Sequence, residues 1–204
     1  MKTRDPSRTG NGARLQEIVE AAAAAFHDHG YEATSMQDIT DRVGMLKGSL
    51  YHHISSKEEL LAAVLRDTQA GGLDIVDRHR NAQGSCRERL RGFVREYTLY
   101  CIDNRMRAAI FDREFRSLTP ARRRELIATR DRFDRFMRSL LHDGMQSREF
   151  SPDLDVVVTS NTIFSMMNTI YRWYSPSGKT SRTMLAEHVA ELVDRMVAER
   201  PDRG

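Results

Sequence analysis

The sequence predicts an all-α protein of about nine helices, with a small N-terminal three-helix unit and a larger C-terminal helical body. Apolar residues recur at helical spacing along almost the whole 204-residue chain. No segment alternates apolar and polar residues as a half-buried strand would. Single glycines and Ser/Thr-Pro pairs separate the helical segments, as is typical of helix ends.

Composition indicates a globular protein, with 40% hydrophobic and 30% charged residues, a net charge of +3 and a pI of about 9.0. The two cysteines, Cys86 and Cys101, form no CxxC pair or Cys/His cluster, which argues against a zinc site and suits a reducing cytoplasm. The most apolar stretch, residues 156–174, holds too many polar side chains to span a membrane. We therefore expect a cytoplasmic protein with no metal, no cofactor and no membrane partner, and we expect Cys101 to be inert core.

The N-terminal part of the chain predicts an arm followed by a helix. Residues 1–12 are polar and basic, and we expect a flexible arm there. The next helix has one apolar face and ends at Gly30, a residue common after helix C-termini. That face consists of Leu15, Ile18, Val19, Ala22 and Phe26.

Two short helices follow. Ser35 can cap the first of them, and Gly44 ends it. The other runs from about Lys47 to His53. Two short helices joined by three or four residues and braced by a preceding helix form a helix-turn-helix. We therefore assign residues 13–58 to a helix-turn-helix domain.

The second of these short helices has an unusual polar face. It carries Lys47, Ser49, Tyr51, His52 and His53, against the apolar Leu50 and Ile54. A cation, a hydroxyl, a phenol and imidazoles on one exposed face suit a DNA major groove, and Gly48 would let the backbone approach closely. The alternatives are an ordinary exposed amphipathic helix and a histidine metal site, for which no third ligand lies nearby.

The remaining segments predict the body, residues 59–200. Ser55 or Ser56 caps a helix that is weakened at Gly71-Gly72. Further helices are predicted by apolar spacing in residues 90–101, after Thr119-Pro120, within residues 156–174 and in residues 185–196. The last two have apolar surface on more than one side. We expect them to pack against a second copy in a C2 dimer.

Two runs in the N-terminal part of the chain, within residues 26–60, resemble the signature of the TetR family of repressors. They are Gly48-Ser49-Leu50-Tyr51-His52-His53 with Ser56-Lys57-Glu58-Glu59-Leu60, and Phe26-x-x-x-Gly30-Tyr31-x-x-Thr34-Ser35-x-x-x-Ile39. Ile54 stands where the family usually has Phe, which implies altered packing. The resemblance implies a homodimer that binds palindromic operator DNA and answers to a small ligand held in the C-terminal domain.

By the same resemblance, DNA contacts are expected at ten positions. They are Arg4 and Arg8 in the arm, Thr34 and Ser35 at the second helix, Lys47, Gly48, Ser49, Tyr51 and His52 on the third, and Lys57 at the fourth. Residues 1–60 hold seven Lys/Arg against nine Asp/Glu, a net charge of −2. Affinity must therefore depend on a few placed cations and helix N-termini, with a shallow salt dependence.

The C-terminal half carries a second, less specific resemblance. Residues 150–155 and 171–178 are similar to TetR-type regulators of fatty-acid, sterol or other acyl-CoA catabolism, which implies a hydrophobic effector such as an acyl-CoA. Residues 105–138 hold eleven Arg and no Lys, and guanidinium groups suit phosphates. An equally good interpretation is a solvated face with ion pairs such as Asp131–Arg135 and Asp134–Arg138. The expected ligand-binding residues are Phe93, Tyr97, Phe111, Phe115, Phe133, Met137, Phe164, Met167, Asn168, Tyr171 and Trp173.

Three alternatives stay open at this point. One is a TetR-type regulator with a drug-like or aromatic effector, and another is a DNA-binding protein that takes no ligand. An enzyme is a third, but the sequence shows no catalytic triad order, phosphate loop or metal motif. We therefore expect a regulator that is not an enzyme.

Overall fold

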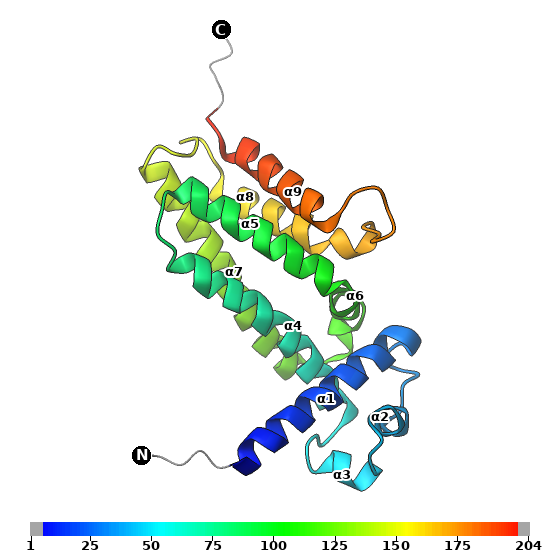
Figure 1. Ribbon diagram of the computed structural model, residues 1–204. Coiled ribbons are helices and arrows are strands. Elements are labelled where there is room, and N and C mark those ends of the chain that lie inside the picture. The colour runs from blue at the N-terminus through cyan, green and yellow to red at the C-terminus, as the bar shows by residue number, and fades with distance from the viewer. Residues whose placement is uncertain (1–5, 200–204) are drawn as a thin grey trace.

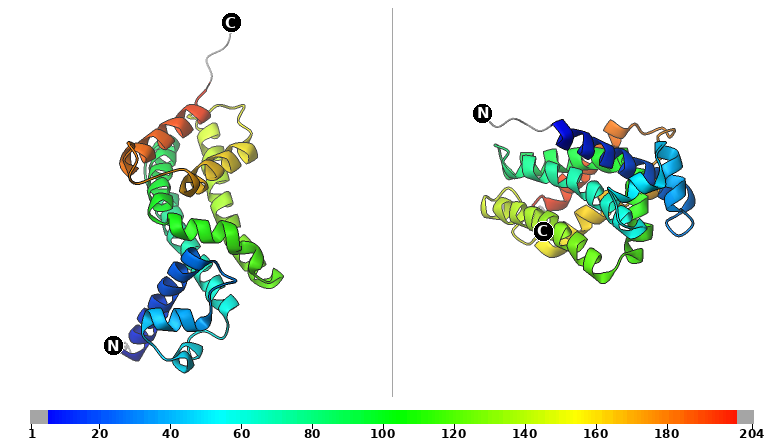
Figure 2. Two further views of the ribbon diagram at one scale, coloured as in Figure 1. Left: turned by 90° about the vertical axis from the view of Figure 1, so that its right-hand side faces the viewer. Right: turned by 90° about the horizontal axis from the view of Figure 1, so that it is seen from below.

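The computed structural model describes residues 6–199, with side chains from residue 12 onward, and every regular element in that range is helical. Figure 1 shows a small head at one end, made of α1 (Pro6–His29), α2 (Met36–Val43) and α3 (Lys47–Tyr51). The views in Figure 2 also place this head at one end of the longer helices. The predicted all-α fold, with nine α-helices in the described range, is confirmed.

The body is built around a central helix. Its elements are α4 (Lys57–Arg80), α5 (Cys86–Asp103), α6 (Arg105–Glu114), the 3-10 turn η1 (Phe115–Ser117), α7 (Pro120–Gln146), α8 (Val156–Asn168), the 3-10 turn η2 (Ile170–Arg172) and α9 (Arg182–Val197). Helix α5 packs against α9 on one side and against α4 and α7 on the other. None of the helices described is both long enough and apolar enough to cross a bilayer.

Two hydrophobic cores share helix α4. Its first half contributes Leu61 and Val64 to the head core, and its second half contributes Leu73 and Val76 to the body core. The head core is completed by Ile110 of α6 and by Leu118 and Leu126 around the start of α7. The expected domain boundary at residue 58 therefore falls in the first turn of α4, a continuous helix that contributes to both cores.

The expected arm is helical over much of its length. Helix α1 begins at Pro6, because proline is well suited to the first position of a helix, where its missing N–H is not needed. The structure therefore places residues 6–12 within α1, and the flexibility of the arm stays a prediction. Residues 1–5 lie outside the described residues.

The Gly71-Gly72 pair, where the sequence predicts a weakened helix, lies within the continuous helix α4. A Cβ atom on Gly71 would lie 2.7 Å from Cε2 of Tyr100, and one on Gly72 would lie 3.0 Å from Cζ of Phe133. The glycines thus let two aromatic rings approach the helix backbone closely. Both rings border the cavity described below.

Helix α6 was not anticipated as a separate element. Its buried side chains are Ile110 and the charged Arg107, so its apolar periodicity is weak. It lies between the head and the rest of the body (Figure 1). Together with α4, it therefore connects the head to the body.

Candidate DNA-binding face and effector cavity

The turn between α2 and α3 is defined by local capping. Ser35 Oγ accepts a hydrogen bond from the Asp38 backbone N–H at 3.2 Å, and Asp38 Oδ2 accepts one from the Ser35 N–H at 2.7 Å. Helix α2 ends at Gly44, whose φ of 67° lies in the left-handed region that favours glycine. The chain then re-enters a helix at Lys47, which produces a helix-turn-helix.

Helix α3 presents a polar face to solvent. Leu50 is fully buried and Ile54 is 4% exposed, and these two side chains anchor the segment to the head core. The exposed positions are Lys47, Gly48, Ser49, Tyr51 and His52. The predicted polar face is therefore exposed except at half-buried His53, and Figure 1 shows α3 at the end of the molecule away from α9.

Two expected phosphate contacts face inward instead. The Thr34 side chain is 1% exposed and donates to the carbonyl oxygens of Ala25 and Gly30. Lys57 Nζ donates to the carbonyl oxygens of Tyr31, Glu32 and Thr34 at 2.9–3.1 Å and lies 4.5 Å from the Tyr31 ring centroid. Unpaired carbonyls at the end of a turn need donors, and these side chains supply them. Both side chains are thus engaged within the head, and the expected phosphate contacts stay a prediction.

Few cations remain for DNA on the described part of the head. Arg14 pairs with Glu17, and Arg42 pairs with Asp28 at 2.9 Å. Among the Lys and Arg side chains of residues 12–60, Lys47 is the one with neither an ion pair nor a hydrogen bond to a described residue. Ser35 is exposed but occupied as a helix cap. Arg4 and the Arg8 side chain lie outside the described residues.

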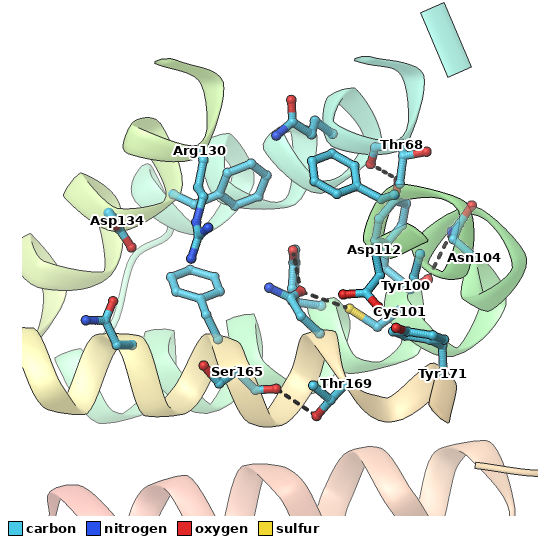
Figure 3. A pocket seen from close by; sticks show the side chains of 18 residues that line it. Thr68, Tyr100, Cys101, Asn104, Asp112, Arg130, Asp134, Ser165, Thr169 and Tyr171 are labelled. Carbon is cyan, nitrogen blue, oxygen red and sulfur yellow. Dashed lines mark hydrogen bonds between the residues drawn. The ribbon is translucent and has the colours of Figure 1, made fainter. Parts of the chain in front are cut away.

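A cavity of about 350 Å³ opens in the body between α4, α5, α6, α7 and α8 (Figure 3). Its inner wall is formed by buried Tyr97, Cys101, Phe133 and Phe164. Its size falls in the range of small-molecule sites. An apolar wall of this kind can hold the hydrophobic part of a ligand.

Six of the eleven expected ligand residues line this cavity. They are Tyr97, Phe111, Phe133, Phe164, Asn168 and Tyr171. Phe93, Met137 and Met167 are buried in the core behind the wall. Phe115 packs against the head core, with its ring centroid 5.5 Å from that of Phe111. Trp173 is 58% exposed and does not line the cavity. These five therefore do not line the cavity, because periodicity identifies an apolar face but not which of its members border a void.

The sequence did not indicate most of the polar lining. The missed residues are Thr68, Gln69, Tyr100, Cys101, Asn104, Ala108, Asp112, Arg130, Asp134, Asn161, Ser165 and Thr169. One signal was present, because Asn161, Ser165 and Asn168 form an exposed polar stripe on the otherwise most apolar helix. Cys101, expected to be inert core, borders the cavity.

The inner wall offers neutral hydrogen-bonding groups. The Tyr97 hydroxyl donates to Asn168 Oδ1 at 3.2 Å, and the Tyr100 hydroxyl donates to the Thr68 carbonyl at 2.5 Å. Burial raises the pKa of Tyr97 well above its usual value and raises the pKa values of Tyr100 and Cys101 to about 12. These three side chains are therefore uncharged at neutral pH.

Three charged residues, Asp112, Arg130 and Asp134, also line the cavity. Asp112 pairs with Arg172 at 2.9 Å, and the Arg172 Nε donates to the Tyr171 hydroxyl at 2.9 Å. Hydrogen bonds from Tyr171 and Arg172 lower the pKa of Asp112 and keep it ionised. Arg130 extends from α7 into the cavity (Figure 3). One guanidinium thus faces a wall that is otherwise neutral or internally paired.

Helix α6 touches the cavity on one face and the head on the other. Ala108, Phe111 and Asp112 line the cavity. The buried Arg107 guanidinium pairs with Glu20 of α1 and with Asp67 of α4, both at 2.6 Å. Displacement of α6 by a ligand would therefore act directly on α1.

Arg113 and Glu114 extend the contact between α6 and the head. Arg113 donates to the carbonyls of Phe26 and His27 at the end of α1. The Tyr31 N–H donates to Glu114 Oε1 at 3.4 Å. The C-terminal end of α1 is therefore held by α6 at several points.

Several arginines of residues 105–138 are used in ion pairs within the protein. The expected Asp134–Arg138 pair is present at 3.6 Å, whereas no Asp131–Arg135 pair occurs among the described residues. Arg122 pairs with Glu58, and Arg132 pairs with Asp77. The interpretation as an ion-paired helix face therefore holds for part of this stretch, and Arg130 is the arginine of this stretch that borders the cavity.

Large apolar side chains are exposed on α8 and α9. Val157 and Val158 are 48% and 58% exposed, and Met184 and Leu192 are each 52% exposed. Two neighbouring helices with exposed aliphatic groups form a surface suited to association. The expected dimer surface lies on the same two helices.

Comparison with known proteins agrees with these features. Residues 18–64 match the family described as bacterial regulatory proteins, tetR family, and residues 83–197 match the tetracyclin repressor-like C-terminal domain. The second match alone spans more than half of the chain. The chain belongs to the TetR family. In this TetR-family chain the N-terminal match ends inside α4, next to Leu65, the last residue that α4 contributes to the head core.

The relatives of this TetR-family protein include regulators of known ligand or DNA association. The transcriptional repressor KstR2 of Mycolicibacterium smegmatis is 31% identical over 183 residues, 89% of each chain. The structure of the ketosteroid transcriptional regulator KstR2 of Mycobacterium tuberculosis is 26% identical with a TM-score of 0.81, covering 92% of this chain and 96% of that one. The structure of AibR in complex with isovaleryl coenzyme A and operator DNA is 28% identical with a TM-score of 0.77, covering 90% and 97%.

Proposed function

We propose that this TetR-family protein is a ligand-responsive transcriptional repressor that binds palindromic operator DNA as a homodimer. The exposed polar face of α3, held by buried Leu50, is the observation that carries the proposal. A short helix that presents a lysine, hydroxyls and imidazole to solvent suits a major groove. The name of the KstR2 relatives as repressors supports repression as the sign of control.

The effector proposed for the cavity is a small hydrophobic molecule, with an acyl-CoA as the first candidate. The aromatic wall suits an acyl chain, and the Tyr97 and Asn168 groups suit a carbonyl or hydroxyl on it. The complex of AibR with isovaleryl coenzyme A supports this class. An aromatic effector without CoA is the second candidate, because the rings of Tyr97, Tyr100, Phe111, Phe133 and Phe164 line the cavity.

Release from DNA would follow from a shift in the position of the head. A ligand that binds one arrangement of α6 better than another shifts the population toward that arrangement. Because Arg107 and Arg113 tie α6 to α1, the shift changes where α3 stands in each protomer. Two recognition helices then no longer match successive major grooves. No chemical step is involved, so the ligand is returned unchanged.

The DNA-binding proposal is tested with genomic fragments selected by the wild-type protein. Lys47→Ala and Tyr51→Ala should each weaken binding about tenfold or more in fluorescence anisotropy, since each removes an exposed contact group. Arg124→Ala, an exposed position on α7, is the matched control and should bind within about twofold of the wild type. Full affinity in both α3 variants would refute the assignment of this helix.

The effector proposal is tested with a series of acyl-CoAs of increasing chain length. At least one should raise the melting temperature, release the DNA fragment and be recovered intact by mass spectrometry. Ala108→Phe, which adds a ring to the cavity wall, should abolish the response, whereas Ala128→Phe on the exposed face of α7 should keep it. If every chain length fails in both assays, an acyl-CoA effector is excluded.

A further inference from the structure

A second hollow, of about 510 Å³, lies between the end of α4, the start of α5 and the middle of α7. Four arginines line it: Arg80, Arg89, Arg132 and Arg135. The remaining lining residues are Ser139 and the buried Phe136 and Leu140, so no carboxylate belongs to the lining. We call this feature the arginine hollow.

The arginine hollow is separate from both sites described above. It shares no lining residue with the effector cavity. Three packed rings lie between the two: the Phe136 and Phe93 ring centroids are 4.9 Å apart, and those of Phe93 and Tyr97 are 5.4 Å apart. It lies at the α4–α5 connection, the end of α4 opposite the head in Figure 1. Contact with operator DNA therefore does not account for its charge.

The charge of the arginine hollow is only partly balanced within the protein. Arg80 and Arg132 share one carboxylate, Asp77, at 3.2 and 3.6 Å. Arg89 donates to the carbonyls of His79 and Arg80, so its charge is not paired with an acid. Arg135 forms no ion pair with any described residue. Four guanidinium groups thus face one acid, and their mutual repulsion favours a bound anion.

The donor set selects the chemistry of that anion. Planar guanidinium forks bind phosphate oxygens in pairs, and Arg132 and Arg135 lie on successive turns of one face of α7. Ser139, one turn further, adds a hydroxyl donor. Donors from three helices around one hollow can contact more than one phosphate at once. We propose that the arginine hollow binds a small molecule that carries two or more linked phosphate groups.

Calorimetric titration of the full chain with inorganic pyrophosphate, at about 150 mM salt to screen non-specific attraction, tests this proposal. We expect one pyrophosphate per chain and at least about tenfold weaker binding of orthophosphate, because a single phosphate reaches fewer guanidinium groups. The double variant Arg132→Ala/Arg135→Ala should bind about tenfold or more weakly. Arg123→Ala/Arg124→Ala, with the same charge change on the same helix outside the hollow, should bind within about twofold of the wild type.

Further experiments test nucleotides and coenzyme A as sources of the phosphate groups and duplex DNA as an alternative ligand. ADP and coenzyme A should compete with pyrophosphate, since both carry a diphosphate. The proposal is overturned if the wild type does not bind pyrophosphate, if it binds orthophosphate equally well, or if both double variants weaken alike. It is also overturned if Arg132→Ala/Arg135→Ala loses affinity for duplex DNA but not for pyrophosphate. The comparison of pyrophosphate with orthophosphate uses only the wild-type protein, so a folding defect in a variant cannot affect it.

Discussion

At the scale of single residues, Thr34 and Lys57 show how position changes a role. Both belong to residue types that bind phosphates, and both match the family signature. In the structure each uses its hydrogen-bond donors on backbone carbonyls of residues 25–34. In this structure they hold the segment that leads into α2, and a direct contact with DNA phosphates stays a prediction.

Replacement of Lys57 by Met should lower stability rather than charge-dependent DNA affinity. It removes donors to three carbonyls and the cation over the Tyr31 ring, and we expect a decrease of about 1–3 kcal/mol in the free energy of unfolding. Chemical denaturation measures this decrease. Lys47→Met is the matched control, since Lys47 is exposed and unpaired among described residues.

The control should give the opposite pattern. Lys47→Met should leave unfolding unchanged and should reduce the slope of log affinity against log salt by about 1 for each phosphate that the Lys47 ammonium neutralises. Salt titration of DNA binding measures that slope. A reduced slope for Lys57→Met at unchanged stability would restore Lys57 as a direct phosphate ligand.

At the scale of elements, a substitution at Gly48 of α3 should affect protein stability and DNA binding differently. A Cβ atom at Gly48 would meet no atom within 4 Å, so alanine fits the free protein. Gly48→Ala should keep or raise stability, by about 0.5–1 kcal/mol at most, because alanine is the better helix former. It should still weaken DNA binding, since the added methyl keeps the α3 backbone from the duplex.

A glycine elsewhere provides the contrast. A Cβ atom on Gly144 would lie 2.1 Å from Cδ2 of the buried Phe150 ring, so Gly144→Ala should lower stability by about 1–3 kcal/mol through overpacking. Denaturation and anisotropy on both variants measure the two effects. If Gly48→Ala binds DNA like the wild type, close backbone approach at α3 is refuted.

Helix α6 is the element that sequence patterns describe least well. It is polar and arginine-rich, and its Arg107 is 6% exposed because Glu20 and Asp67 offset the cost of burying the charge. The hydrogen bond from Arg107 also lowers the pKa of Glu20. Those partners come from α1 and α4, so no local pattern in residues 105–114 could have indicated them.

At the scale of the whole molecule, the exposed aliphatic groups of α8 and α9 predict the assembly. Val158→Glu/Leu192→Glu should convert a dimer into a folded monomer, because charges placed in an apolar interface are stripped of hydration. Light scattering after size-exclusion chromatography measures the mass. Ile127→Glu, on α7 and 47% exposed, is the matched control and should remain dimeric. A wild-type monomer, or a dimer of the double variant, would refute this surface.

The amino-acid sequence alone determined the helix-turn-helix and the helices other than α6. These depend on periodicity, Ser35 and Gly44 caps and a compact motif, all of which act over a few residues along the chain. It also determined the polar face of α3, because a five-residue helix has room for only one buried side.

The tertiary structure decided which residues border the cavity and which charges are already paired. Phe133 and Met137 lie one turn apart on α7, yet only Phe133 reaches the void. Lys57 and Arg107 carry charges that look free in the sequence and are held by groups 23 to 87 residues away. Such outcomes depend on how helices distant in the chain are placed together, and no local pattern encodes that placement.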